Sequence, residues 1–192
     1  CREGLDHGLH RPLGHELPNL LVEASHTLRG FLDGGEVLLH ADLLGRVIEV
    51  VSGMPFDAFL RRRLFEPCGM TSSWFQVPGP QAKRLTTNYG AMGSALMPID
   101  PAETSIYLDK PPAPFGGTGL VSSPRDYDRF LSMLANFGRA GRERVMGELA
   151  VRVGTGNLLP DGVAGPSMGP TANFGAGGRV GIGADSGQFG WE

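Results

Sequence analysis

The sequence lacks the features that would place it in a membrane or on nucleic acid. No apolar run approaches the roughly 18 residues that a membrane-spanning helix needs. Charge is nearly balanced, with 17 basic and 20 acidic residues and a formal net charge of −3. The longest basic run, Arg61–Arg63, is typical of the solvent-facing side of a helix. We therefore expect a soluble globular chain with no nucleic-acid partner and no membrane span.

Cysteine is scarce, and histidine is confined to one end of the sequence. Cys1 and Cys68 lie far apart without a C-x-x-C spacing, which argues against a zinc ribbon or a disulfide-rich scaffold. All 5 histidines lie within the first forty residues, where His7, His10 and His15 accompany no helix or strand pattern. Glycine-rich stretches never show the G-x-G-x-x-G spacing of a dinucleotide site. We expect no metal and no cofactor, and the cellular compartment stays open.

Ordered apolar patterns begin near Asp42 and predict three helices, over 42–52, 55–67 and 123–137. The first has one apolar stripe that we expect to be buried, and Gly53 is placed to end it. This stripe consists of Leu43, Leu44, Val47, Ile48 and Val51. In the third helix, Ser123 is the expected N-cap, with Pro124 in the first turn. Its expected inner stripe is Tyr127, Phe130, Leu131 and Leu134.

Turn-forming residues dominate the segment between the second and third helices. Residues 71–118 contain Pro-Gly-Pro and Lys-Pro-Pro runs and predict a long excursion with short strands near 73–77 and 119–122. A weaker helix follows Gly147, and a glycine-rich tail leads to a strand that begins near the last residues. Such an excursion often forms the wall of a pocket.

One named catalytic pattern occurs and is rejected on its surroundings. Residues 165–169 satisfy G-x-S-x-G around Ser167, the nucleophile elbow of α/β-hydrolases. That elbow needs a buried strand before the serine and a helix after it, whereas Pro166 and Pro170 flank Ser167 here. No histidine follows His40 to complete a triad.

The order of several segments resembles the β-lactamase-related serine hydrolases, which include class C β-lactamases, family VIII carboxylesterases and DD-peptidase-like proteins. The resemblance runs from about residue 41 to 192 and rests on the runs DLLGRVIEVVSGMPFDAFLRRRLFEPCGM, GGTGLVSSPRDYDRFLSMLANFG, NLLPDG and GQFGW. It implies an α+β chain, a partial β-lactamase/transpeptidase-like fold with a helical subdomain and part of an antiparallel sheet. It also implies an acyl-enzyme mechanism on a small ester or β-lactam-like substrate in complete relatives.

The catalytic motifs that the resemblance implies are missing from this sequence. The family activates a serine with a lysine one helical turn later, as S-x-x-K. The lysines here are Lys83 and Lys110, and Pro80 and Tyr107 stand three residues before them. Val37 occupies the expected position of the family's tyrosine. We therefore assign no catalytic residue and expect this chain to be inactive.

A third family motif survives in part. Trp191 matches the first residue of the Trp-Gly-Gly variant, but Glu192 follows it. In the preceding excursion, Phe115, Gly117 and Thr118 are the residues we expect to line the cleft of a complete relative, because a glycine-rich turn lets backbone approach a ligand closely. A tight turn with no ligand role is the alternative.

The resemblance also divides the chain into two parts. Residues 41–192 correspond to a partial domain that lacks the first and last sheet strands, about half of the family's usual domain, whereas residues 1–40 are divergent. Residues 35–39 can be encoded so that a one-base shift reads Gly-Arg-Ser-Tyr-Ser, near the family's Tyr-Ser signature. The hypothesis that the N-terminal segment is out of frame is decided by the nucleotide sequence.

Three functions remain open at this point. The first is a piece of a serine acyl hydrolase of the esterase or β-lactamase type. The second is a catalytically dead, penicillin-binding-like ligand-binding module, and the third is a globular fragment of unrelated function. Substrate and oligomeric state are not specified, since fold similarity alone does not assign a substrate.

Overall fold

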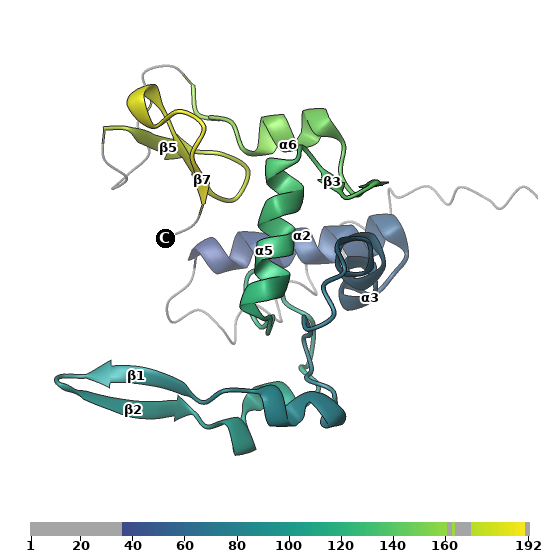
Figure 1. Ribbon diagram of the computed structural model, residues 1–192, viewed down its shortest axis with the longest axis vertical. Helices are drawn as coiled ribbons and strands as arrows, with labels where there is room; N and C mark the ends of the chain where they lie inside the picture. Colours follow the sequence, from purple (N-terminus) through teal and green to yellow (C-terminus); the bar gives the residue numbers. More distant parts are fainter. Residues whose placement is uncertain (1–35, 161–162, 164–169, 191–192) are drawn as a thin grey trace, which may run out of the picture.

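The computed structural model describes residues 36–160, 163 and 170–190, with side chains from residue 41 (Figure 1). Helices and short antiparallel strands alternate along the chain, which confirms the α+β class. The helices are α2 (Glu36–Ser52), α3 (Phe56–Leu60), the π-helical η2 (Arg61–Phe65), α4 (Glu66–Cys68), α5 (Pro124–Ala135) and α6 (Glu148–Gly154). The strands are β1 (Asn88–Met92), β2 (Ala95–Asp100), β3 (Arg139–Ala140), β4 (Glu143–Arg144), β5 (Ala172–Phe174), β6 (Arg179–Gly181) and β7 (Phe189–Gly190).

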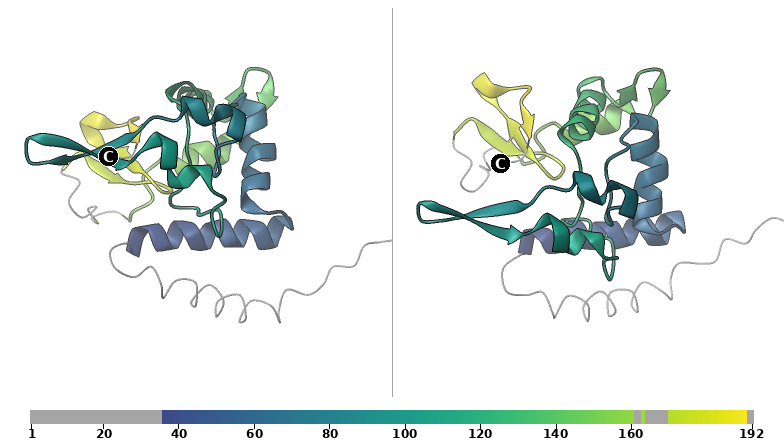
Figure 2. Two further views of the ribbon diagram at one scale, coloured as in Figure 1. Left: turned by 90° about the horizontal axis from the view of Figure 1, so that it is seen from below. Right: turned by 60° about the horizontal axis from the view of Figure 1, so that its bottom comes forward.

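Helix α2 and the α3–η2–α4 segment form a corner. In both views of Figure 2, α2 lies across the bottom of the molecule and α3 rises from its C-terminal end. Gly53 ends α2 with φ +66°, as the sequence predicts. Glu49 fixes the corner because its carboxylate accepts the Phe56 N–H at 2.9 Å, at the start of α3. Helix α2 begins at Glu36 and not at Asp42, so it extends into the part of the chain where no periodicity predicted it.

The apolar core joins the α3–η2–α4 segment to α5. Its buried members are Phe65, Cys68, Met70 and Met133, against which Leu60, Leu64, Phe130, Leu134, Ala140 and Val145 pack. The predicted end of the second helix at Pro67 is one residue early, since Cys68 is its last residue and Gly69 follows with φ +67°. This left-handed residue turns the chain toward Met70, which re-enters the core.

Helix α5 has the N-terminus that the sequence predicts but a different buried face. The Ser123 hydroxyl caps it by accepting the Asp126 N–H at 3.2 Å, and Pro124 is its first residue. Tyr127 and Leu131, expected to face inward, are 53% and 39% exposed. The residues at 1% exposure are Asp126 and Met133, because the polar cluster around Asp126 rotates the helix away from the purely apolar stripe.

The predicted apolar stripe of α2 is mainly exposed. Leu44, Val47 and Val51 are 62%, 46% and 76% exposed, whereas Gly45 is buried. The helix packs through its small and polar side because Gly45 allows the backbone of Gly116 to approach: a Cβ on Gly45 would lie 3.4 Å from the Gly116 nitrogen. The prediction that this stripe is buried is therefore wrong among the described residues.

The strands of the excursion differ from those expected. The segments predicted at 73–77 and 119–122 meet only as an isolated bridge, in which Trp74 and Val121 exchange hydrogen bonds of 2.8 and 2.9 Å. The excursion instead contains the hairpin β1–β2, which the sequence analysis missed. This hairpin turns at Gly93 and Ser94, where Gly93 has φ +63°, and it extends away from the helices in Figure 1.

The last part of the described chain is a small antiparallel sheet in the order β5-β6-β7. Ala172 and Val180 are buried in it, and Phe189 pairs with Val180 across the β6–β7 ladder. The helix expected after Gly147 is α6, with Gly147 as its N-cap residue. Among the described residues, none of the helices has the length and apolar character to span a bilayer.

The exposed stripe on α2 leads to a prediction about solution behaviour. We expect the purified chain to unfold without a sharp transition and to scatter light by non-specific association, since neighbouring exposed apolar side chains favour aggregation. The double substitution Leu44→Lys and Val51→Lys should reduce the scattering. Leu149→Lys, at a 74% exposed leucine of α6, is the control that should not. A sharp, cooperative melt of an unmodified monomer, followed by circular dichroism, would contradict this prediction.

Candidate functional site

The glycine-rich turn of residues 115–118 is held against the N-terminal half of α2. The Gly117 N–H donates a hydrogen bond of 2.8 Å to Oδ1 of Asp42. Gly116 lies so close to the helix that an added Cβ would overlap the carbonyl of Ala41. These two contacts place Phe115 and Thr118 beside α2, with Phe115 partly buried and Thr118 exposed.

This turn adjoins the helix segment where the family resemblance places a catalytic tyrosine. Val37 occupies that position and lies in α2, five residues before Asp42. At about 1.5 Å of rise per residue, the two positions are roughly 7.5 Å apart along the helix axis. The Asp42–Gly117 hydrogen bond therefore fixes the turn at about one and a half helical turns from that position.

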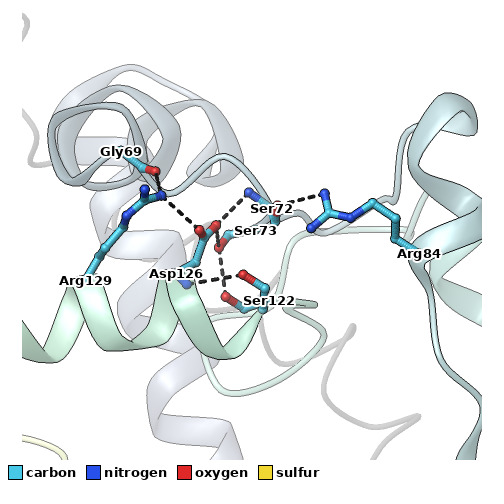
Figure 3. Close-up of polar contacts among 8 residues, drawn as sticks. Gly69, Ser72, Ser73, Arg84, Ser122, Asp126 and Arg129 are labelled. Carbon is cyan, nitrogen blue, oxygen red and sulfur yellow. Dashed lines mark hydrogen bonds and ion pairs between the residues drawn. The ribbon is translucent and has the colours of Figure 1, made fainter.

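A second polar cluster is centred on the Asp126 carboxylate (Figure 3). Its Oδ2 accepts the Ser72 N–H at 2.6 Å and the Ser73 hydroxyl at 3.0 Å. Its Oδ1 lies 3.4 Å from the Arg129 guanidinium, which also donates to the carbonyl of Gly69. With Asp126 at 1% exposure, these donors compensate for its removal from water.

Two further contacts extend this cluster. The hydroxyls of Ser73 and Ser122 lie 2.8 Å apart, and Arg84 donates to the Ser72 hydroxyl at 3.0 Å. Nucleophilic activation of a serine requires a neighbouring base such as lysine or histidine. The side-chain partners of these serines are instead other serines, a carboxylate and an arginine, so the cluster has the chemistry of a structural tie.

A cavity of about 400 Å³ lies between α4, α5 and β3. Cys68 and Arg129 are among the residues that line it, and Cys68 is a free, buried cysteine. Burial raises the pKa of the Cys68 thiol. A thiol with a raised pKa stays protonated at neutral pH and is a poor nucleophile. Among the residues with described side chains, no group of three or more potential ligands could hold a metal ion.

The structure places some of the sequence-derived site residues and leaves others outside its description. Phe115, Gly117 and Thr118 lie together on the turn against α2. Trp191 and Ser167 lie outside the described residues. The sequence analysis missed Asp42 as the acceptor for the turn and Asp126 as the centre of the polar cluster. The sequence offered only a weak signal for these two roles. Both aspartates fall in the first turn of a predicted helix, where the helix dipole ordinarily explains an acidic residue.

Comparison with known proteins assigns the family. Residues 39–191 match the sequence profile of the Beta-lactamase family, so the chain belongs to that family. No curated protein sequence matches the chain. Family membership places the chain among these proteins, and by itself it does not assign this chain's activity.

Several solved structures share the fold. EstCE1, described as a hydrolase with promiscuous acyltransferase activity, is 23% identical with a TM-score of 0.60, and the match covers 77% of this chain and 40% of EstCE1. The octameric penicillin-binding protein homologue from Pyrococcus abyssi is 18% identical (TM-score 0.58, 81% of this chain and 34% of that one). Simvastatin synthase LovD from Aspergillus terreus is 19% identical (TM-score 0.57, 73% and 37%).

These matches confirm a partial β-lactamase/transpeptidase-like fold. The chain spans 40% or less of the length of each of these three proteins.

The Asp126 cluster gives a stability prediction with a matched control. Asp126→Ala should lower the free energy of unfolding by about 2–4 kcal/mol, because the Ser72 N–H and the Ser73 hydroxyl lose their buried acceptor. Asp126→Asn, which keeps one acceptor oxygen, should have an intermediate effect. Asp128→Ala, on the exposed side of the same helix, should change stability by less than about 0.5 kcal/mol. Because the chain is expected to unfold without a sharp transition, hydrogen exchange of the α5 amides measures all three, and equal effects of the Asp126→Ala and Asp128→Ala substitutions would disprove the role of Asp126.

Proposed function

We propose that this chain is the part of a serine acyl hydrolase of the esterase or β-lactamase type that frames the substrate cleft without supplying the nucleophile. The observation that carries this proposal is the combination of family membership over residues 39–191 with the absence of any S-x-x-K in the sequence. The hydrolysis of an ester or β-lactam through an acyl-enzyme would belong to a longer protein that contains that motif.

The absence of a nucleophile is supported by where the lysines and serines lie. Lys83 and Lys110 are preceded at the third position by Pro80 and Tyr107, so neither activates a serine one helical turn before it. Ser123 is occupied as the N-cap of α5. Acyl transfer loses most of its rate when the members of such a catalytic unit are removed, leaving what binding and oxyanion stabilisation provide.

The cleft-framing role is proposed for the turn of Phe115, Gly117 and Thr118. Its support is the anchoring of the turn to α2 by Asp42, near the helix position that corresponds to the family's tyrosine. Because the Gly117 N–H is already bonded to Asp42, the exposed Thr118 side chain is the first group of this turn that we expect to face a substrate. Trp191 is proposed as the remnant of the family's third motif on the basis of the sequence alone.

Inactivity of the isolated chain is directly testable. We expect the purified protein to hydrolyse neither nitrocefin nor a p-nitrophenyl ester above the buffer rate, because its sequence contains no S-x-x-K. The Ser167→Ala and Ser123→Ala proteins should show the same background hydrolysis rate as the unmodified chain. Saturable turnover that either substitution abolishes, and that Ser186→Ala leaves unchanged, would overturn the proposal and identify the nucleophile.

The cleft assignment is tested in a longer member of the family. A crystal structure of its covalent acyl-enzyme should show the acyl group in van der Waals contact with the residues that correspond to Phe115 and Thr118. The residue that corresponds to Asp42 should still accept the hydrogen bond from the turn. An acyl group lying more than a few ångströms from this turn would leave the turn with a purely structural role.

A further inference from the structure

The β1–β2 hairpin exposes an uncharged, apolar surface. Residues 85–99 contain no charged side chain, although charged residues make up 19% of the chain. Tyr89, Met92, Leu96 and Ile99 are 55–70% exposed. Among the described elements, neither strand has an extensive contact except with the other, and Figures 1 and 2 show the hairpin projecting from the body. An isolated two-stranded hairpin is only marginally stable in water, so further pairing would stabilise it.

The two edges of this hairpin differ in their capacity for pairing. The Met92–Ala95 pair closes the two-residue turn and is therefore a hydrogen-bonded pair. From it, non-bonded and hydrogen-bonded pairs alternate along the ladder. Ala91–Leu96 and Tyr89–Pro98 are then non-bonded pairs, whose backbone groups point outward. On the outer edge of β2, Pro98 has no N–H to donate. On the outer edge of β1, Tyr89 and Ala91 both present an N–H and a carbonyl.

We propose that β1 pairs with β1 of a second copy of this chain, in antiparallel orientation about a twofold axis, to form a four-stranded sheet. With the axis at Gly90, Tyr89 of each copy lies opposite Ala91 of the other, and these pairs exchange about four hydrogen bonds. Gly90 then faces its own counterpart in the close non-bonded pair. A second copy fits this edge because neither surface contains a charge that would oppose the pairing.

The small size of the contact indicates a weak assembly. Interfaces contain about one hydrogen bond per 100–200 Å², so about four bonds correspond to roughly 400–800 Å² of buried surface. This is below the roughly 1,200 Å² that stable complexes bury. The expected assembly is therefore a reversible dimer with a micromolar or weaker dissociation constant.

Sedimentation velocity over a concentration series tests the proposal on the full chain, with Leu44→Lys and Val51→Lys present to suppress association through α2. Ala91→Pro removes an outward N–H from the edge of β1, and Leu96→Pro is the matched substitution on the edge of β2. We expect Ala91→Pro to weaken dimerisation at least tenfold, which corresponds to about 1.4 kcal/mol. Leu96→Pro should leave dimerisation unchanged.

Cysteine cross-linking tests the register independently of proline's effect on folding. In a Cys1→Ser background, a mixture of Tyr89→Cys and Ala91→Cys chains should form disulfide-linked dimers, since a hydrogen-bonded pair has Cα atoms about 5.5 Å apart. Either variant alone should not form them, because the equivalent cysteines of two identical chains would be diagonal neighbours, about 7–8 Å apart. A monomer at every concentration, equal effects of the two proline substitutions, or equal cross-linking with and without mixing would each overturn the proposal.

Discussion

The buried Asp126 carboxylate is the contact on which the arrangement of the helices depends. It joins the first turn of α5 to the Ser72–Ser73 segment that follows the α3–η2–α4 helix, and Arg129 adds a link to Gly69. Removing a carboxylate from water is costly unless donors surround it, so α5 docks in the one rotation that satisfies those donors. That rotation places Met133 in the core beside Phe65 and Met70 and leaves Tyr127 at the surface.

Helix α2 is positioned by a different kind of contact. Gly45 and Gly116 permit backbone to approach backbone, and Asp42 and Glu49 bond to main-chain N–H groups of neighbouring segments. Polar and small residues thus orient this helix, while its leucine and valine stripe faces outward. The same contacts hold the Phe115–Thr118 turn near the helix position that would carry the catalytic tyrosine. This is why the proposed cleft wall can persist in a sequence that contains no S-x-x-K.

The excursion between α4 and α5 shows how one segment can serve the fold and still present a surface. The Trp74–Val121 bridge joins its two ends, and at the end of β2 the Asp100 carboxylate accepts the Ser105 hydroxyl at 2.6 Å. Between these ties the β1–β2 hairpin has no comparable anchor among the described elements. The uncharged side chains of this hairpin, and the different hydrogen-bonding capacity of the outer edges of β1 and β2, therefore belong to the surface and not to the core.

The sequence by itself determined the local signals and the family. The Ser123 N-cap, the glycine stop at Gly53 and the three main helices follow from short-range chemistry, in which a hydroxyl caps nearby amides and glycine adopts positive φ. The absence of S-x-x-K is likewise a property of the sequence alone. Tertiary structure decided which helix faces are buried, because long-range partners such as Ser72 for Asp126 and Gly117 for Asp42 outweigh apolar periodicity. No local pattern encodes those partners, which are 54 and 75 residues away along the chain.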